Sequence, residues 1–105
     1  MSRVKLVWFV PEEALDVTRD AVFEAGGGRI GDYTHCSWYV AGTGTFFGGE
    51  GASPALGESG REERVAELRV ETVVPERRIR DAVAALRLAH PYEEPAYDVY
   101  PLVDQ

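Results

Sequence analysis

Four segments rich in β-branched and aromatic residues, with a helical pattern after the first and after the third, most constrain what this chain can fold into. The segment 4–10 is almost continuously apolar, with one fully apolar face and one mixed face that includes Lys5, and this is typical of a central strand covered on both sides. Proline follows this segment directly at Pro11, and Pro75 ends a later one in the same way. The predicted strands are Val4–Val10, Asp32–Val40, Arg64–Val74 and Ala96–Leu102.

Two helices are predicted between these strands, and each opens at a proline. Proline suits the first turn of a helix, and the carboxylates of Glu12 and Glu13 favour the positive end of the helix dipole. The glycines 26–28 then end the first helix by allowing a left-handed cap. In the helix after Pro75, the apolar residues recur at helical spacing, at Ile79, Ala82, Val83 and Leu86.

The resulting order, strand–helix–strand–strand–helix–strand, predicts an α+β fold of the ferredoxin-like βαββαβ type. Right-handed crossovers place the first and third strands in the centre of an antiparallel four-stranded sheet, with both helices on one face. Pro95 and Pro101 agree with an edge position for the last strand, since proline cannot donate to a strand ladder. At 105 residues the chain is expected to form a single domain, 1–105. A long glycine-rich surface loop is expected at about 43–60.

Charge and cysteine content exclude several classes of function. The formal net charge of −7 argues against a nucleic-acid partner, which requires clustered Lys and Arg. Cys36 is the only cysteine, so no intramolecular disulfide and no cysteine-based zinc cluster can form. The first apolar stretch stops at Pro11, too early for a signal peptide or a membrane span. We therefore expect a cytoplasmic protein without a membrane partner.

The sheet face away from the helices is expected to mediate assembly. It should carry Val7, Phe9, Val65 and Val73 among charged residues, and such a mixture suits a sheet-to-sheet contact between copies. The alternative is an ordinary exposed face on which Lys5 and Arg69 pair with glutamates across strands. The prediction is a homo-oligomer, a trimer or otherwise a dimer.

The corner after the second helix offers candidate ligand groups. His90, Glu93 and Glu94, together with His35, could bind a divalent metal ion, because imidazole and carboxylates suit zinc, manganese or iron. In the alternative interpretation, His90 contacts the last carbonyls of the helix and the glutamates shape a turn. Two histidines in the whole chain also make a closed metal site hard to build.

Two further features are candidate sites. The glycine-rich loop, with Thr43 and Thr45, could cradle an anion with backbone N–H groups, although no Gly-Lys-Ser/Thr follows as in a P-loop. The alternative is a flexible connection without a ligand. Cys36 beside His35 suggests a thiolate nucleophile, but neighbours in a strand point to opposite faces. Cys36 is therefore expected in the core with Trp38 and Val40.

Several ordered motifs resemble a known family. They are the segments 31–37 (GDYTHCS), 42–46 (GTGTF), 51–57 (GASPALG), 67–71 (ELRVE) and 90–102 (HPYEEPAYDVYPL). Together they resemble the insertion domain of the YqfO/YbgI-type proteins, the NGG-interacting factor three-like family. The resemblance implies a fold similar to the PII and CutA proteins, which assemble as trimers. Phe47-Gly48-Gly49 departs from the family pattern, which tends to place a proline there.

What the resemblance implies about function is limited. Full-length members carry flanking segments that supply a dinuclear metal site, and this sequence is expected to be the insertion domain alone. A hydrolase or cyclohydrolase label therefore does not transfer. The first hypothesis is a non-catalytic oligomeric module that binds a small ligand, a cation or a protein partner. The second is a small metal-dependent hydrolase-type enzyme. Either would use a cleft between subunits, lined by Thr43, Thr45, His90, Glu93 and Glu94.

Overall fold

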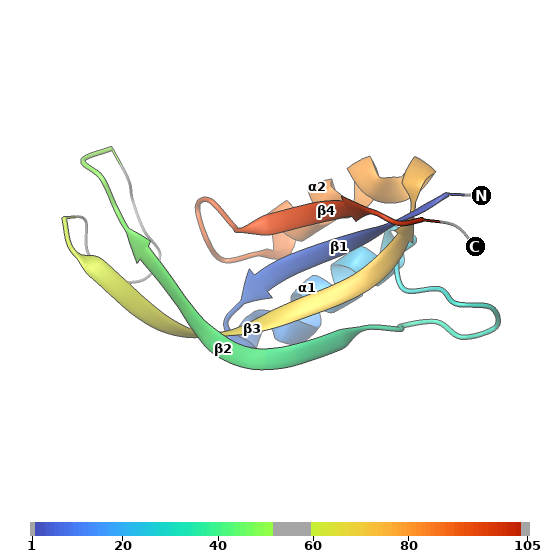
Figure 1. Cartoon of the computed structure of the whole chain (residues 1–105), viewed down its shortest axis with the longest axis horizontal. Coiled ribbons are helices and arrows are strands. Elements are labelled where there is room, and N and C mark those ends of the chain that lie inside the picture. The colour runs from blue at the N-terminus through green and yellow to red at the C-terminus, as the bar shows by residue number, and fades with distance from the viewer. Residues whose placement is uncertain (1, 52–59, 104–105) are drawn as a thin grey trace.

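One antiparallel sheet of four strands, in the order β2-β3-β1-β4, carries two helices on one face (Figure 1). The computed structural model describes residues 2–51 and 60–103. The predicted ferredoxin-like fold is confirmed, with β1 and β3 in the centre and β2 and β4 at the edges. The elements are β1 Arg3–Val10, α1 Leu15–Glu24, β2 Trp38–Phe47, β3 Glu62–Pro75, α2 Ile79–Ala89 and β4 Tyr97–Pro101.

Both helices begin as the prolines predicted. Pro11 and Pro75 each precede a short 3₁₀ turn, Glu12–Ala14 and Glu76–Arg78, which continues into α1 and α2. The proline ring fixes φ near the helical value, so the chain turns directly from strand into helix. At the end of α1, Gly26 adopts a φ of 112° and the Gly27 N–H donates to the Val22 carbonyl at 3.0 Å. No helix in the described part of the chain is long and apolar enough to cross a membrane.

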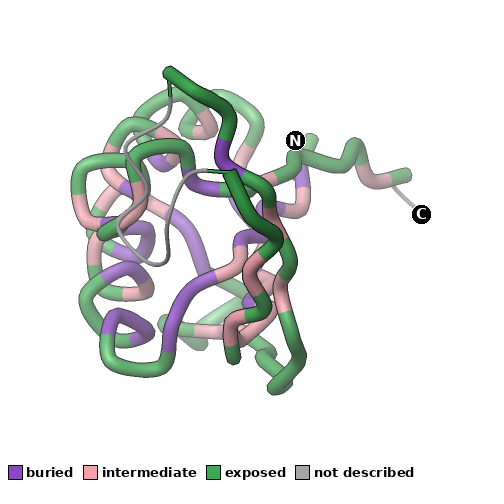
Figure 2. The backbone as a smooth tube through the Cα atoms, turned by 90° about the vertical axis from the view of Figure 1, so that its left-hand side faces the viewer, coloured by how far each residue is buried: buried purple, intermediate pink, exposed green. Residues whose placement is uncertain are grey.

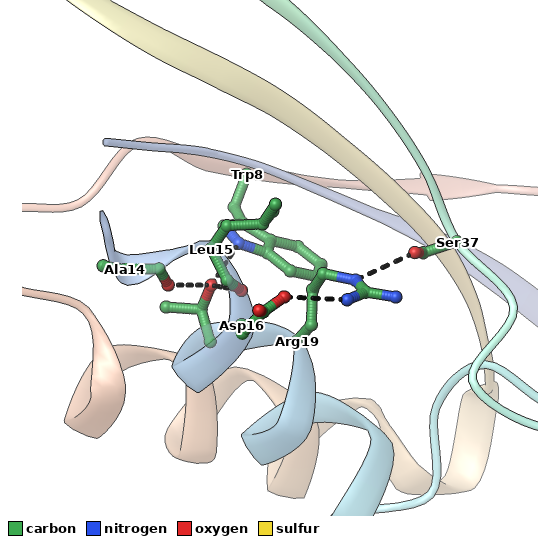
Figure 3. Close-up of polar contacts among 7 residues, drawn as sticks. Trp8, Ala14, Leu15, Asp16, Arg19 and Ser37 are labelled. Carbon is green, nitrogen blue, oxygen red and sulfur yellow. Dashed lines mark hydrogen bonds and ion pairs between the residues drawn. The ribbon is translucent and has the colours of Figure 1, made fainter. Parts of the chain in front are cut away.

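The core lies between the helices and the sheet, where Figure 2 shows the buried stretches of the backbone. Trp8 is completely buried there, and its indole N–H donates to the Thr18 hydroxyl at 3.1 Å (Figure 3). Thr18 in turn donates to the Ala14 and Leu15 carbonyls within α1. This contact satisfies the one polar group of the largest buried side chain.

The second strand differs from its prediction at both ends. It was expected over 32–40, but β2 begins at Trp38 and continues through Phe47. Residues 28–37 instead form a loop that is closed by a hydrogen bond from the Cys36 N–H to the Gly28 carbonyl, at 2.9 Å. The expected start of the long loop at 43 is also wrong, because 43–47 pair with 62–66 of β3. Residues 52–59 of that loop lie outside the described residues.

Cys36 does not pack in the core with Trp38 and Val40, contrary to the prediction. It lies in the loop before β2 and is partly exposed, and Trp38 and Val40 are themselves 60% and 43% exposed. The prediction failed because Cys36 lies in a loop, and because the register of β2 on β3 places Trp38 and Val40 beside Glu71 and Arg69, on the sheet face away from the helices.

The strands β2 and β3 extend beyond the rest of the sheet as a two-stranded ribbon (Figure 1). Residues 68–75 of β3 pair with β1, whereas residues 62–67 pair with β2 alone. The ribbon makes the molecule elongated, with principal extents of 46 × 23 × 23 Å. It projects from the end of the sheet at which the connection between α2 and β4 lies.

Candidate functional site

The connection between α2 and β4, residues 90–96, forms a corner that His90 fastens to the sheet. His90 ends α2, where its backbone N–H donates to the Leu86 carbonyl at 2.9 Å. Its ring Nδ1 accepts the Tyr92 N–H at 3.1 Å, so the proton of the neutral ring lies on Nε2. Nε2 donates to the Phe9 carbonyl of β1 at 2.6 Å. The ring therefore contacts a strand rather than the helix carbonyls that were predicted.

Burial keeps the His90 ring neutral. The side chain is 6% exposed, and desolvation lowers the pKa of His90 from its ordinary value, against the smaller opposing effects of the Phe9 carbonyl and Glu67. Both ring nitrogens are already engaged. His90 thus serves as a fastening residue in this chain, and a ligand would have to displace one of these bonds to reach it.

Tyr92 and Glu67 complete the corner. The Tyr92 ring lies 4.8 Å from the His90 ring, and its buried hydroxyl forms no hydrogen bond of normal geometry within the described residues. Burial, followed by the nearby Glu67 carboxylate, raises the pKa of Tyr92. Glu67 also lies against Gly44 of β2, where a Cβ would stand 1.9 Å from Glu67 Oε1. The glycine therefore makes room for this carboxylate.

The other predicted residues are placed in three different parts of the molecule. Glu93 and Glu94 are exposed on the corner. Thr43 and Thr45 are exposed on the ribbon, where they pair with Ala66 and Arg64. By alternation their side chains lie on the ribbon face opposite that of Glu67.

His35 is separated from the corner, because its loop lies at the other end of the sheet (Figure 1). Among the described residues, no three His, Cys, Asp or Glu side chains are grouped so that they could hold a metal ion. Glu67 was not predicted as a site residue, because the local sequence of β3 gives no sign of a partner far away in the chain. Its neighbours Gly44 and Tyr92 are both more than 20 residues away.

The sheet face away from the helices, called the open face below, carries a charged network over a buried valine. Glu71 accepts from Arg69 at 3.0 Å and pairs with Lys5 at 3.3 Å. Arg69 and Lys5 hold the pKa of the Glu71 carboxyl below its usual range. Val7, which was predicted on this face as part of a contact between copies, is fully buried within the single chain. Of the pairs in the alternative interpretation, Lys5 does pair with a glutamate across strands, whereas Arg69 pairs with the same glutamate along its own strand.

Exposed apolar side chains adjoin this network on the edge strand β2. Trp38 pairs with Glu71, and Val40 pairs with Arg69, so both lie on the open face. Arg69 also lies over the Phe9 ring, with its Cζ atom 5.7 Å from the ring centroid. The open face thus combines a large exposed aromatic side chain with a fixed pattern of charges.

Comparisons with known proteins confirm the resemblance seen in the sequence. The chain is 60% identical to "GTP cyclohydrolase 1 type 2 homolog" of Mycobacterium tuberculosis, over 94% of this chain and 26% of that protein. It matches a Bacillus cereus protein related to NIF3 with a TM-score of 0.86 and 45% identity, over 98% of this chain and 26% of the other. No family model matches.

A more distant structure shares the fold alone. The periplasmic divalent cation tolerance protein CutA from Archaeoglobus fulgidus matches with a TM-score of 0.73 and 11% identity, over 98% of this chain and 86% of that one. The chain spans about a quarter of the length of its curated relatives, at 26%, so their name assigns no activity to it.

Proposed function

Because the chain is homologous to one segment of the NIF3-related proteins and has the CutA fold, we propose that it is a non-catalytic, oligomeric binding module. In this proposal, copies of the chain assemble through the open face as a trimer, or otherwise as a dimer. A cytoplasmic setting is part of the proposal, and the single cysteine is compatible with it.

The observation that carries the proposal is the exposure of Trp38 and Val40 beside the Lys5–Glu71–Arg69 network. Tryptophan and arginine are enriched among the residues that dominate the energy of protein interfaces. A monomer would leave Trp38, which is 60% exposed, in contact with water. Covering it with a second copy would remove this apolar area from solvent, while the charges fix the orientation of the contact.

The ligand site is proposed to form between copies. Thr43 and Thr45 on the projecting ribbon, and Glu93 and Glu94 on the corner, lie towards the same end of the molecule (Figure 1). A rotational assembly can bring the ribbon of one copy against the corner of the next. The carboxylates favour a cation or a positively charged partner, and His90 contributes by holding the corner in place.

The oligomeric part is tested by light scattering at micromolar concentration. The parent chain should have the mass of a trimer or dimer, and Val40→Asp should shift it to the monomer mass. Leu88→Asp is the matched control, since Leu88 is 90% exposed but lies on α2, away from the open face. A monomeric parent, or equal effects of the two changes, would contradict the proposed interface.

The site is tested by equilibrium dialysis of the parent chain against Zn²⁺ and Mn²⁺. Glu94→Gln should weaken any binding without changing the oligomer, because it removes one exposed charge from the corner. Glu12→Gln, an exposed carboxylate elsewhere, is the control. Metal binding unchanged by Glu94→Gln would remove the corner from the proposal.

A further inference from the structure

The two edge strands of the sheet differ in how well they are protected against pairing with another strand. An edge strand leaves a row of backbone N–H and C=O groups without a ladder partner, and natural proteins block such edges with charges, prolines or short strands. Strand β4 has five residues, contains Asp98 and ends at Pro101. Strand β2 has ten residues, WYVAGTGTFF, with no proline and no charged side chain, although 28% of the whole chain is charged. The edge of β2 is therefore open to pairing.

The side chains of β2 are as accessible as its edge. It is the outermost strand of the sheet, and within the part of the chain that the structure describes it pairs with β3 alone. None of its residues is buried, and residues 38–43 are all exposed. The aromatic side chains of Trp38, Tyr39 and Phe47 are each at least 49% exposed, and aromatic residues are enriched in the buried centres of protein interfaces. The edge thus offers both backbone groups for pairing and apolar side chains for packing.

Strand β2 is also held in its extended form before any contact is made. It pairs with β3 along its whole length, from Trp38 to Phe47. At its start, the Arg19 side chain of α1 donates to the Ser37 hydroxyl at 3.1 Å (Figure 3) and lies over the Tyr39 ring, 5.8 Å from the ring centroid. An edge fixed in advance loses little conformational entropy when another strand pairs with it.

A second copy of β2 matches this edge better than the other edges of the sheet do. Because β2 carries no charged side chain, two copies of it can pair without setting like charges opposite each other. Strand β4 covers only half the length of β2, and its proline cannot donate to a ladder. The segment 62–67 of β3, which extends beyond β1, has four charged side chains among its six residues.

We infer that two copies of the chain pair antiparallel through β2, around a two-fold axis normal to the sheet. Each copy contributes its four strands to one continuous sheet, with the helices of both copies on the same side. The inference rests on the self-association proposed above and selects the dimer from the two assemblies. Trp38 and Val40 then meet the second copy along this edge.

The symmetry leaves two registers that use nearly all of β2. Because the axis keeps each face of the sheet on its own side, residues directly opposite each other differ by an even number of positions. One register sets Trp38 opposite Phe46 of the second copy, and the other sets Tyr39 opposite Phe47 of the second copy. Each forms two such aromatic pairs across the strands. Each also forms about nine backbone hydrogen bonds, close to the roughly ten of a typical protein interface.

Disulfide cross-linking tests the strand contact. In a Cys36→Ser background, which removes the only native cysteine, Gly42→Cys and Thr43→Cys each place a thiol at the centre of one register. Directly opposite Cα atoms lie about 4.5–5.5 Å apart, within the range of a disulfide. One of the two variants should become a cross-linked dimer under mild oxidation. Val99→Cys on β4 is the control and should stay uncross-linked. Failure of both β2 variants, or equal cross-linking of the control, would overturn the inference.

Light scattering of Ala41→Lys separates this contact from the open face. Ala41 is exposed and by alternation lies on the face opposite that of Val40, so the lysine blocks the edge and leaves the open face unchanged. The variant should have half the mass of the dimeric parent, and the control Val99→Lys should keep the parent mass. If Ala41→Lys keeps the parent mass while Val40→Asp lowers it, the open-face contact stands and the strand pairing is overturned. A trimeric parent would also overturn the strand pairing alone, whereas a monomeric parent would overturn both.

Discussion

The Nε2 atom of His90 lies 2.6 Å from the carbonyl oxygen of Phe9, and this bond joins the end of α2 to the end of β1 across 81 positions of the chain. It exists only while Nε2 carries the proton and Nδ1 is free to accept the Tyr92 N–H. Protonation of Nδ1 would break the second bond and place a charge in a buried site.

This relationship predicts a pH dependence of stability. Because burial lowers the pKa of His90 in the folded chain below its ordinary value of 6.5, the unfolded chain binds the proton more readily. The contribution of the neutral His90 ring to the free energy of unfolding is fully present above pH 6.5. It is lost as the pH falls below that value towards the lowered pKa. Urea unfolding of the parent chain should give a lower free energy of unfolding at pH 5.5 than at pH 7.5.

Replacing His90 by Gln should flatten that response and cost about 1–3 kcal/mol at pH 7.5, where a buried hydrogen-bonding network is broken. His35→Gln is the control, since His35 is exposed and should leave the pH response unchanged. A parent and a His90→Gln variant with the same dependence between pH 7.5 and 5.5 would show that His90 does not carry the effect.

Thr18→Val should destabilise the core although it keeps the shape of the side chain. The change leaves the buried indole N–H of Trp8 without its acceptor, which costs about 1–3 kcal/mol. Thr18→Ser keeps the hydroxyl and should lower the free energy of unfolding by less than Thr18→Val does. Urea unfolding at one fixed protein concentration measures both, and equal costs for Val and Ser would show that the hydrogen bond contributes nothing measurable.

Gly44→Ala should disturb the corner, whereas Gly42→Ala should be neutral or slightly stabilising. A Cβ at Gly44 would stand 1.9 Å from Glu67 Oε1, while a Cβ at Gly42 meets nothing within 4 Å. Both glycines lie in β2, so the difference isolates the contact with Glu67. We expect Gly44→Ala to give a lower free energy of unfolding than Gly42→Ala, because the end of the Glu67 side chain must first move aside.

Adding Glu67→Ala to Gly44→Ala should recover that cost, because the displaced carboxylate is then gone. A double-mutant cycle from urea unfolding gives the coupling free energy between the two positions. Purely additive effects would show that Glu67 moves aside freely.

Gly28→Ala should be more destabilising than Gly31→Ala, although both glycines have positive φ values, 80° and 58°. At Gly31 the cost is the backbone conformation alone, about 1–2 kcal/mol, since a Cβ there meets nothing within 4 Å. At Gly28 the variant has the same backbone cost and also a steric clash, because the added Cβ would stand 2.6 Å from the Phe23 ring. Thermal unfolding of the two variants compares them, and a smaller loss at Gly28 would contradict the packing of the loop against α1.

The sequence by itself determined the order of the elements and the central place of β1 and β3. The almost continuous apolar character of 4–10, and the prolines 11 and 75 that turn strand into helix, act through local sterics and burial. Such properties belong to a short stretch of chain, so they can be predicted without knowing its neighbours. The assembly, the ligand and the site residues remain predictions.

Only the tertiary structure decided where β2 begins and which candidate residues come together. The start at Trp38 depends on pairing with Glu71 of β3, and the approach of Glu67 to Gly44 depends on the same register. The approach of Glu67 to Tyr92 depends on how the connection between α2 and β4 packs against β3. The His90 ring bonds to the Phe9 carbonyl rather than to a carbonyl of its own helix, while the loop that carries His35 lies at the other end of the sheet. Local patterns specify a strand or a helix, but partners far apart in the chain are selected only when the whole sheet and its helices pack together.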